Sequence, residues 1–142
     1  MTNDRGQGMR KLTVTGVVFC LMLLPSLLGA ATYDGSVPLL CASMTVLECD
    51  KTGTCAQRTV ESTNIPPFVT IDFEKKTISD TNNVDRTSMI KHLERLDGHL
   101  VMHGGEHGRG WNIVIAEETG TLSASAVGEG VGFVIFGVCT PR

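Results

Sequence analysis

The sequence predicts an all-β domain, a small antiparallel meander of about eight strands that closes as a barrel or flattens into a sandwich and is stapled by disulfides. Short runs rich in β-branched and aromatic residues, among them "FVTIDF" and "WNIVI", recur along the chain. Tight-turn signals such as Asp97-Gly98 separate these runs. Helical periodicity is almost absent over the same stretch, which also contains four cysteines.

The N-terminus has the layout of a secretory signal peptide, which we place at residues 1–31. A basic start is followed by the apolar run "LTVTGVVFCLMLL", then by Pro25 and the small residues of "SLLGAA". Cleavage after Ala31 fits best, with Ala30 as the neighbouring alternative. The other interpretation is an uncleaved membrane anchor over residues 12–31, because about twenty apolar residues span a bilayer. The proline and the small residues favour cleavage, which leaves residues 32–142 as a single β domain with no stable membrane anchor.

The predicted mature domain is acidic. The whole chain has 12 basic and 15 acidic residues and a net charge of −3. The predicted signal peptide contains three of the basic residues and one acidic residue, so residues 32–142 keep nine and fourteen, a net charge of −5. Nucleic acid and anionic lipid select basic surfaces, so neither is an expected partner. An exported domain of this kind belongs in the periplasm or outside the cell.

The four cysteines of the mature domain predict two disulfides, as is usual in exported chains. Cys41 and Cys49 lie eight residues apart in one regular element, about 26 Å as a strand or 12 Å as a helix. Both lengths exceed the limit of about 7 Å between bridged α-carbons. The turn "DKTGT" brings Cys49 opposite Cys55, so we predict the pairs Cys49–Cys55 and Cys41–Cys139. A zinc site is the alternative, but no C-x2-C pair supports it.

The first half of the domain predicts four strands. "VPLLCASMTVLEC" forms the first, although a short helix from Pro38 is an alternative for residues 37–42. "CAQRTV" returns from the turn, and "ESTNIPP" is a loop with one helical turn capped by Thr59. "FVTIDF" and "TIS" form a hairpin around Lys75-Lys76, and the polar loop "DTNNVDR" follows.

The second half predicts a run of hairpins. "SMIKHLERL" and "HLVMH" pair through Asp97-Gly98, a two-residue turn that needs positive φ at both positions. A glycine-rich connection, "GGEHGRG", leads to "WNIVI", "TLSASAV" and "VGFVIFGVC". The last strand is apolar on both faces. Val131, Phe133 and Ile135 lie on one face, and Val134, Phe136 and Val138 on the other. We expect one of these faces to meet the core and the other to be covered by the N-terminal segment tethered through Cys41.

The hairpin at Asp97-Gly98 also places three of the four histidines. A two-residue turn sets His92 opposite His103, with Glu94 diagonal to them. We expect Met89, Leu93, Leu100 and Met102 on the core face, and His92, Glu94, His99 and His103, with Ile90, on the outer face. Two imidazoles and a carboxylate are ligands that zinc accepts, so His92, His103 and Glu94 form a candidate metal site. The competing interpretation is a set of solvated histidines, because an exposed sheet face lacks groups that orient ligands.

A second candidate site lies in the glycine-rich connection, where Glu106, His107 and Arg109 are close in sequence and form a candidate ligand site. The competing interpretation is turn chemistry, with Trp111 as a core anchor. Sequence motifs of hydrolases, zinc proteases and phosphate-binding loops are absent from the sequence. The sequence thus favours a non-enzymatic protein and predicts no cofactor.

The pattern "YDGSVPLLCA…ECDKTGTC…IPPFVTIDFEKKTIS…GRGW…TG…GFVIFGVCT" resembles small uncharacterised exported proteins of Gram-negative bacteria, over essentially the whole mature domain. That resemblance implies export but no activity. The general plan also resembles the disulfide-stapled periplasmic inhibitors of lysozyme, although the Ser-Gly-x-x-Tyr loop of those inhibitors is missing.

Together these features predict a non-enzymatic exported domain that binds a protein or a small apolar ligand. The alternatives are a periplasmic enzyme with a site near Glu106, His107 and Arg109, or a lysozyme-inhibitor-like protein.

Overall fold

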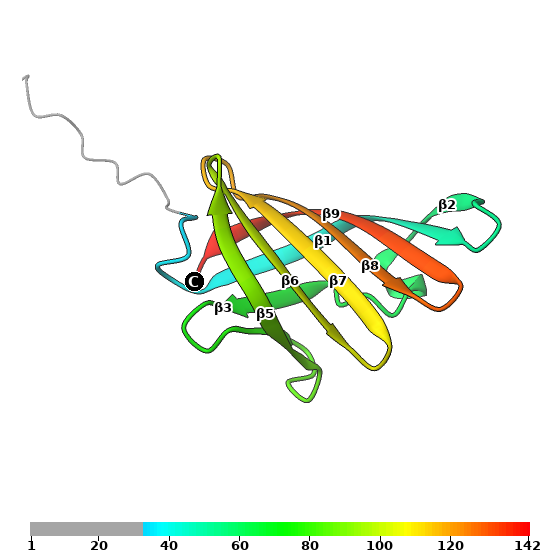
Figure 1. Ribbon diagram of the computed structural model, residues 1–142, viewed down its shortest axis with the longest axis horizontal. Helices are drawn as coiled ribbons and strands as arrows, with labels where there is room; N and C mark the ends of the chain where they lie inside the picture. The colour runs from blue at the N-terminus through cyan, green and yellow to red at the C-terminus, as the bar shows by residue number, and fades with distance from the viewer. Residues whose placement is uncertain (1–32) are drawn as a thin grey trace, which may run out of the picture. The chain divides into compact units, whose positions relative to one another are not determined.

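The computed structural model describes residues 33–142. The signal peptide predicted at residues 1–31 lies outside the described residues. Residues 33–142 contain no helix long and apolar enough to cross a membrane. The all-β prediction is confirmed (Figure 1): nine strands and one short 3-10 turn, η2 at Val60–Ser62, make up the described fold. The strands are β1 (Leu39–Asp50), β2 (Cys55–Arg58), β3 (Phe68–Asp72), β4 (Thr77–Asp80), β5 (Thr87–Leu96), β6 (His99–Glu106), β7 (Arg109–Ala116), β8 (Thr121–Gly128) and β9 (Val131–Pro141).

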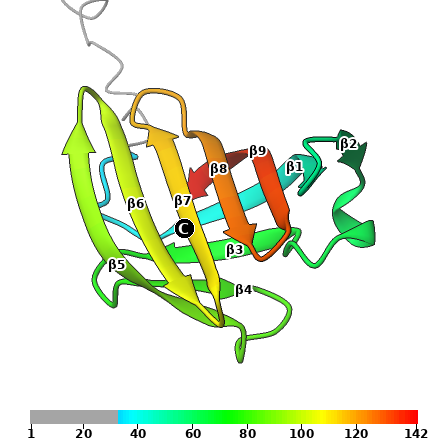
Figure 2. The same ribbon diagram turned by 45° about the vertical axis from the view of Figure 1, so that its right-hand side comes forward.

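Eight of the strands close into an antiparallel barrel, so of the two predicted architectures the barrel is found. Consecutive strands from β3 to β9 pair with each other, and β1 pairs with both β3 and β9. The long strand β1 uses its first half, from Leu39 to Ala42, against β3 and its second half, from Val46 to Cys49, against β2. β2 is therefore an extra strand that pairs with one end of β1 outside the barrel, and Figure 2 shows it to one side.

The helical alternative for residues 37–42 is wrong. Leu39 to Ala42 pair with β3 on one side and with β9 on the other, so both edges of this segment are used in the sheet. Leu39 and Cys41 are fully buried in the barrel. The predicted helical turn near Thr59 is present as η2, but the Thr59 side chain makes no capping hydrogen bond.

Alternating side chains of the strands fill the barrel. The main buried cluster combines residues from both ends of the chain, including Leu39, Ile71, Ile90, Met102, Ile115 and Leu122. A smaller cluster of Val46, Val60 and Ile135 lies under η2. Both predicted disulfides are confirmed, Cys41–Cys139 between β1 and β9 and Cys49–Cys55 between β1 and β2.

The segment before β1 packs against the barrel at the end formed by the β5–β6 and β7–β8 turns. Gly35 lies against Phe73 and Leu100, and Tyr33 packs its ring against Gly120. Arg95 donates a hydrogen bond to the carbonyl of Asp34 at 2.6 Å. These contacts cover part of this end of the core, and a hollow of about 360 Å³ lined by Gly35, Phe73 and Leu93 lies beside them.

The expected cover over the outer face of β9 is not found in residues 33–142. Val134, Phe136 and Val138 are 38%, 44% and 48% exposed. The reason is that the segment tethered near Cys41 runs over the barrel end, where it contacts Phe73, Leu100 and Gly120, and leaves the side of the barrel free.

Candidate ligand cavity

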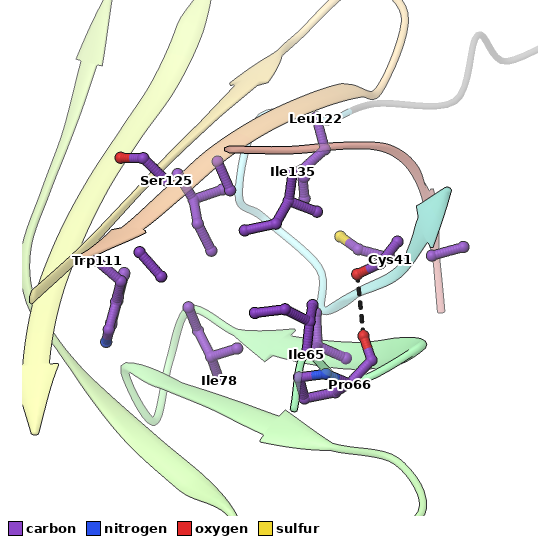
Figure 3. Close-up of a pocket in the computed structure, with 14 residues that line it drawn as sticks. Cys41, Ile65, Pro66, Ile78, Trp111, Leu122, Ser125 and Ile135 are labelled. Atoms are coloured by element: carbon purple, nitrogen blue, oxygen red, sulfur yellow. Dashed lines mark hydrogen bonds between the residues drawn. The ribbon is translucent and has the colours of Figure 1, made fainter. Parts of the chain in front are cut away.

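An apolar cavity of about 130 Å³ lies towards the other end of the barrel. Figure 3 shows the side chains of Ile65, Ile78 and Ile135 converging on it from different elements. The walls are almost entirely carbon. The remaining lining residues are Cys41, Ala42, Ser43, Pro66, Val69, Trp111, Ile113, Leu122, Ala124, Ser125 and Ala126.

Side-chain size along the strands explains why the cavity lies at this end. Towards the covered end, large side chains such as Met102 and Ile115 are fully buried. Towards the other end, β8 contributes the small residues Ala124, Ser125 and Ala126 after Leu122, and β1 contributes Ala42 and Ser43 after Cys41. Small side chains leave an interior volume that an eight-stranded barrel otherwise fills. The sequence signal for the cavity is the run of small residues in "TLSASAV", a segment that also predicts a strand.

The segment between η2 and β3 forms one wall of the cavity and is held by three hydrogen bonds from two residues, Ser43 and Arg86. Ser43 donates from its hydroxyl to the carbonyl of Pro66 at 2.9 Å (Figure 3), and from its backbone to the carbonyl of Pro67 at 2.9 Å. Arg86 donates to the carbonyl of Asn64 at 2.7 Å. This wall is built by contacts between residues distant in sequence, which local sequence patterns do not reveal.

The cavity continues outward into a mouth of about 190 Å³ with a charged rim. The two share a set of apolar lining residues: Ile65, Pro66, Val69, Ile78, Trp111 and Ile113. The rim adds Asp80 and Arg86, which form an ion pair at 3.2 Å, and Glu106 and Arg109. The opening therefore passes from charged groups at the surface to an apolar interior.

Trp111 joins the mouth to the cavity. Its ring packs against the core as predicted, and its Nε1 donates to the hydroxyl of Ser88 at 2.9 Å. The indole lies over Gly104, where a Cβ would overlap the ring. Beyond the predicted role as core anchor, Trp111 lines both the cavity and the mouth.

Two of the three residues predicted in the glycine-rich connection reach the mouth. The expected long connection is wrong, because β6 continues to Glu106 and β7 begins at Arg109, which leaves only His107 and Gly108 in the turn. Both have positive φ, 49° and 74°, as a tight hairpin turn requires. Glu106 and Arg109 are therefore register partners that line the mouth, whereas His107 is an exposed turn residue outside that lining.

The predicted histidine pair is present on the outer face. His92 pairs with His103 in the register, and their rings stack with centroids 5.1 Å apart. His92 Nε2 lies 3.6 Å from Glu94 Oε2, and both side chains are 53% exposed. Among residues 33–142, no group of three or more histidine, cysteine or acidic side chains is arranged to hold a metal ion.

One part of the predicted hairpin is wrong. The register shifts between Ile90 and His92, so Ile90 is buried and Met89 is 48% exposed, the reverse of the expectation. A β-bulge inserts one residue, which moves every side chain before it to the other face.

Comparisons with protein-family models, with curated proteins and with solved structures find no match for this chain.

Proposed function

We propose that this protein is a non-enzymatic, exported binding protein that holds a small apolar ligand inside its barrel. The observation that carries the proposal is the apolar cavity of about 130 Å³ that opens through a charged mouth. Ligand sites of this type combine apolar walls with a few polar groups that orient the ligand.

The volume of the cavity limits the ligand. A dry apolar cavity of about 150 Å³ accepts benzene, and this cavity is only slightly smaller. The apolar part of the ligand therefore corresponds to one six-membered ring or a branched chain of similar size. The cavity wall also favours binding over catalysis. Its cysteine, Cys41, forms a disulfide and is not a free nucleophile, and the charged side chains lie on the rim and not in the cavity.

Export to the periplasm or beyond is part of the proposal. The two disulfides support it, because such bonds persist in oxidising compartments. The signal-peptide pattern of residues 1–31 and the resemblance to small exported proteins of Gram-negative bacteria support it as well.

The test is a titration of the oxidised mature protein with benzene, followed by NMR of the methyl groups of Ile113 and Ile135. We expect saturable shifts at both isoleucines. Ala124→Leu and Ala126→Leu fill the cavity and should each abolish the shifts, while Ala56→Leu, on the exposed strand β2, should leave them unchanged. Absence of saturable binding, or binding that survives both cavity-filling substitutions, would overturn the proposal.

A further inference from the structure

The rim of the mouth contains an opposite-charge pair that does not form an ion pair. Glu106 and Arg109 are register partners across the two-residue β6–β7 turn. Directly opposed residues of an antiparallel pair lie about 5 Å apart and normally interact when their charges are opposite. Within residues 33–142, however, neither side chain lies within 4.0 Å of an oppositely charged partner, by contrast with Asp80 and Arg86 nearby.

The separation has a structural cause in Gly128 on the neighbouring strand β8. The side chain of Arg109 lies along this glycine, where a Cβ would come within 3.0 Å of the arginine Cγ. The absence of a side chain at residue 128 thus gives the arginine stem a place away from Glu106. The rim therefore presents a carboxylate and a guanidinium that are separated from each other, and each can meet a charged group of a ligand.

The other two charges of the rim are already engaged. Asp80 accepts from Arg86 at 3.2 Å and from the backbone of Asn82 at 2.9 Å. Arg86 also donates to the carbonyl of Asn64. The four charges of the rim sum to zero, and the two charged groups left for a ligand are one acceptor, Glu106, and one donor, Arg109.

We propose that the ligand is a free α-amino acid with an aromatic or branched aliphatic side chain. The side chain enters the apolar cavity, Arg109 binds the α-carboxylate through its planar fork, and Glu106 accepts hydrogen bonds from the α-ammonium. This inference rests on the proposed function, because it assigns the head group of a ligand whose apolar part fills the cavity. A ligand with only one charge would leave the opposite rim group without a partner.

The experiment compares four ligands that share a benzene ring: L-phenylalanine, 3-phenylpropanoate, 2-phenylethylamine and benzene itself, each measured by calorimetric titration of the mature protein. We expect phenylalanine to bind roughly tenfold more tightly than either singly charged compound. The reason is that 3-phenylpropanoate lacks the contact with Glu106 and 2-phenylethylamine lacks the contact with Arg109. The Arg109→Gln variant should bind phenylalanine only as tightly as the wild type binds 2-phenylethylamine, which lacks the carboxylate. The Glu106→Gln variant should bind phenylalanine only as tightly as the wild type binds 3-phenylpropanoate, which lacks the ammonium group. Benzene affinity should not change in either variant.

Matched controls carry the same substitutions elsewhere. Arg58→Gln lies on β2 and Glu118→Gln on the turn at the covered end, and both should bind phenylalanine as the wild type does. If benzene binds in the cavity but phenylalanine binds no more tightly than the acid and the amine, the head-group assignment is overturned while the proposed function stands. If Ala124→Leu leaves phenylalanine binding intact, the amino acid binds outside the cavity, and the inference that its side chain enters the cavity is overturned. If none of the four ligands binds, both proposals fail.

Discussion

Trp111 on β7 lies against Gly104, its register partner on β6, so closely that a Cβ on residue 104 would overlap the indole. The same Cβ would lie 2.6 Å from the carbonyl oxygen of Met89. Neither neighbour moves easily, because one is backbone and the other is a ring held by a hydrogen bond to Ser88. Glycine at residue 104 is therefore a packing requirement of the cavity wall.

Gly104→Ala should lower the free energy of unfolding by about 1–3 kcal/mol, the usual cost of inserting a methyl group into a packed site. It should also weaken benzene binding, because the displaced indole lines the cavity. Gly110→Ala is the matched control, since no atom lies within 4 Å of a Cβ there, and it should stay within about 0.5 kcal/mol of wild type. Equal losses in urea unfolding of the two variants would contradict the packing argument.

The sequence was sufficient where short-range geometry decides the structure. The Asp97-Gly98 turn fixed which residues of the hairpin oppose each other, and the pairing of His92 with His103 follows from it. The pairing of Cys49 with Cys55 follows from the turn between them in the same way. In both cases a few residues and a known turn geometry determine the outcome.

The sequence was insufficient where distant segments decide the structure. The bulge before His92 places Ile90 in the core, a one-residue shift that alternation alone does not reveal. Gly104 belongs to a strand because it pairs with Ile90 of β5 and Trp111 of β7, whereas the local run of glycines predicted a loop. The cavity itself depends on the segment containing Ile65, which packs across the barrel opening only in the folded chain.

The two disulfides should contribute unequally to stability. Cys41–Cys139 joins residues 98 apart and Cys49–Cys55 residues 6 apart. On the loop-entropy estimate the first bridge stabilises by about 4.7 kcal/mol and the second by about 2 kcal/mol. Replacing both cysteines of a bridge by alanine avoids a free thiol, and chemical unfolding of the two double variants measures the difference. A larger loss for the short-loop variant would refute the ranking.

The exposed histidine pair should be unimportant for folding and should not bind zinc tightly. His92→Gln and His103→Gln should each change stability by no more than about 0.5 kcal/mol, because both rings lie on the outer face of the sheet. Micromolar zinc should not raise the melting temperature of the wild type. A saturable rise that both variants lose would show a metal site, since a ligand specific for the native state stabilises it.

The ion pair of Asp80 and Arg86 should matter more than an exposed ion pair of similar geometry. The side chain of Asp80 is only 6% exposed, so Arg86→Gln leaves a buried carboxylate without its charge partner. We expect the free energy of unfolding to fall by about 3 kcal/mol. This value is at the lower end of the range for breaking a buried ion pair, because Asp80 keeps its hydrogen bond from the backbone of Asn82. Arg58→Gln, which breaks the exposed pair with Glu48, should cost less than about 1 kcal/mol.

A double variant separates the charge from the other contacts of Arg86. Arg86→Gln also removes the hydrogen bond to the carbonyl of Asn64, which helps hold the cavity wall. Adding Asp80→Asn removes the buried charge but does not restore that hydrogen bond. If the unpaired carboxylate causes most of the loss, the double variant should regain most of the stability in urea unfolding, because a neutral buried pair has little desolvation cost. If it stays as unstable as Arg86→Gln alone, the hydrogen bond to the cavity wall is the dominant contribution, and the variant should then also show altered methyl signals at Ile65.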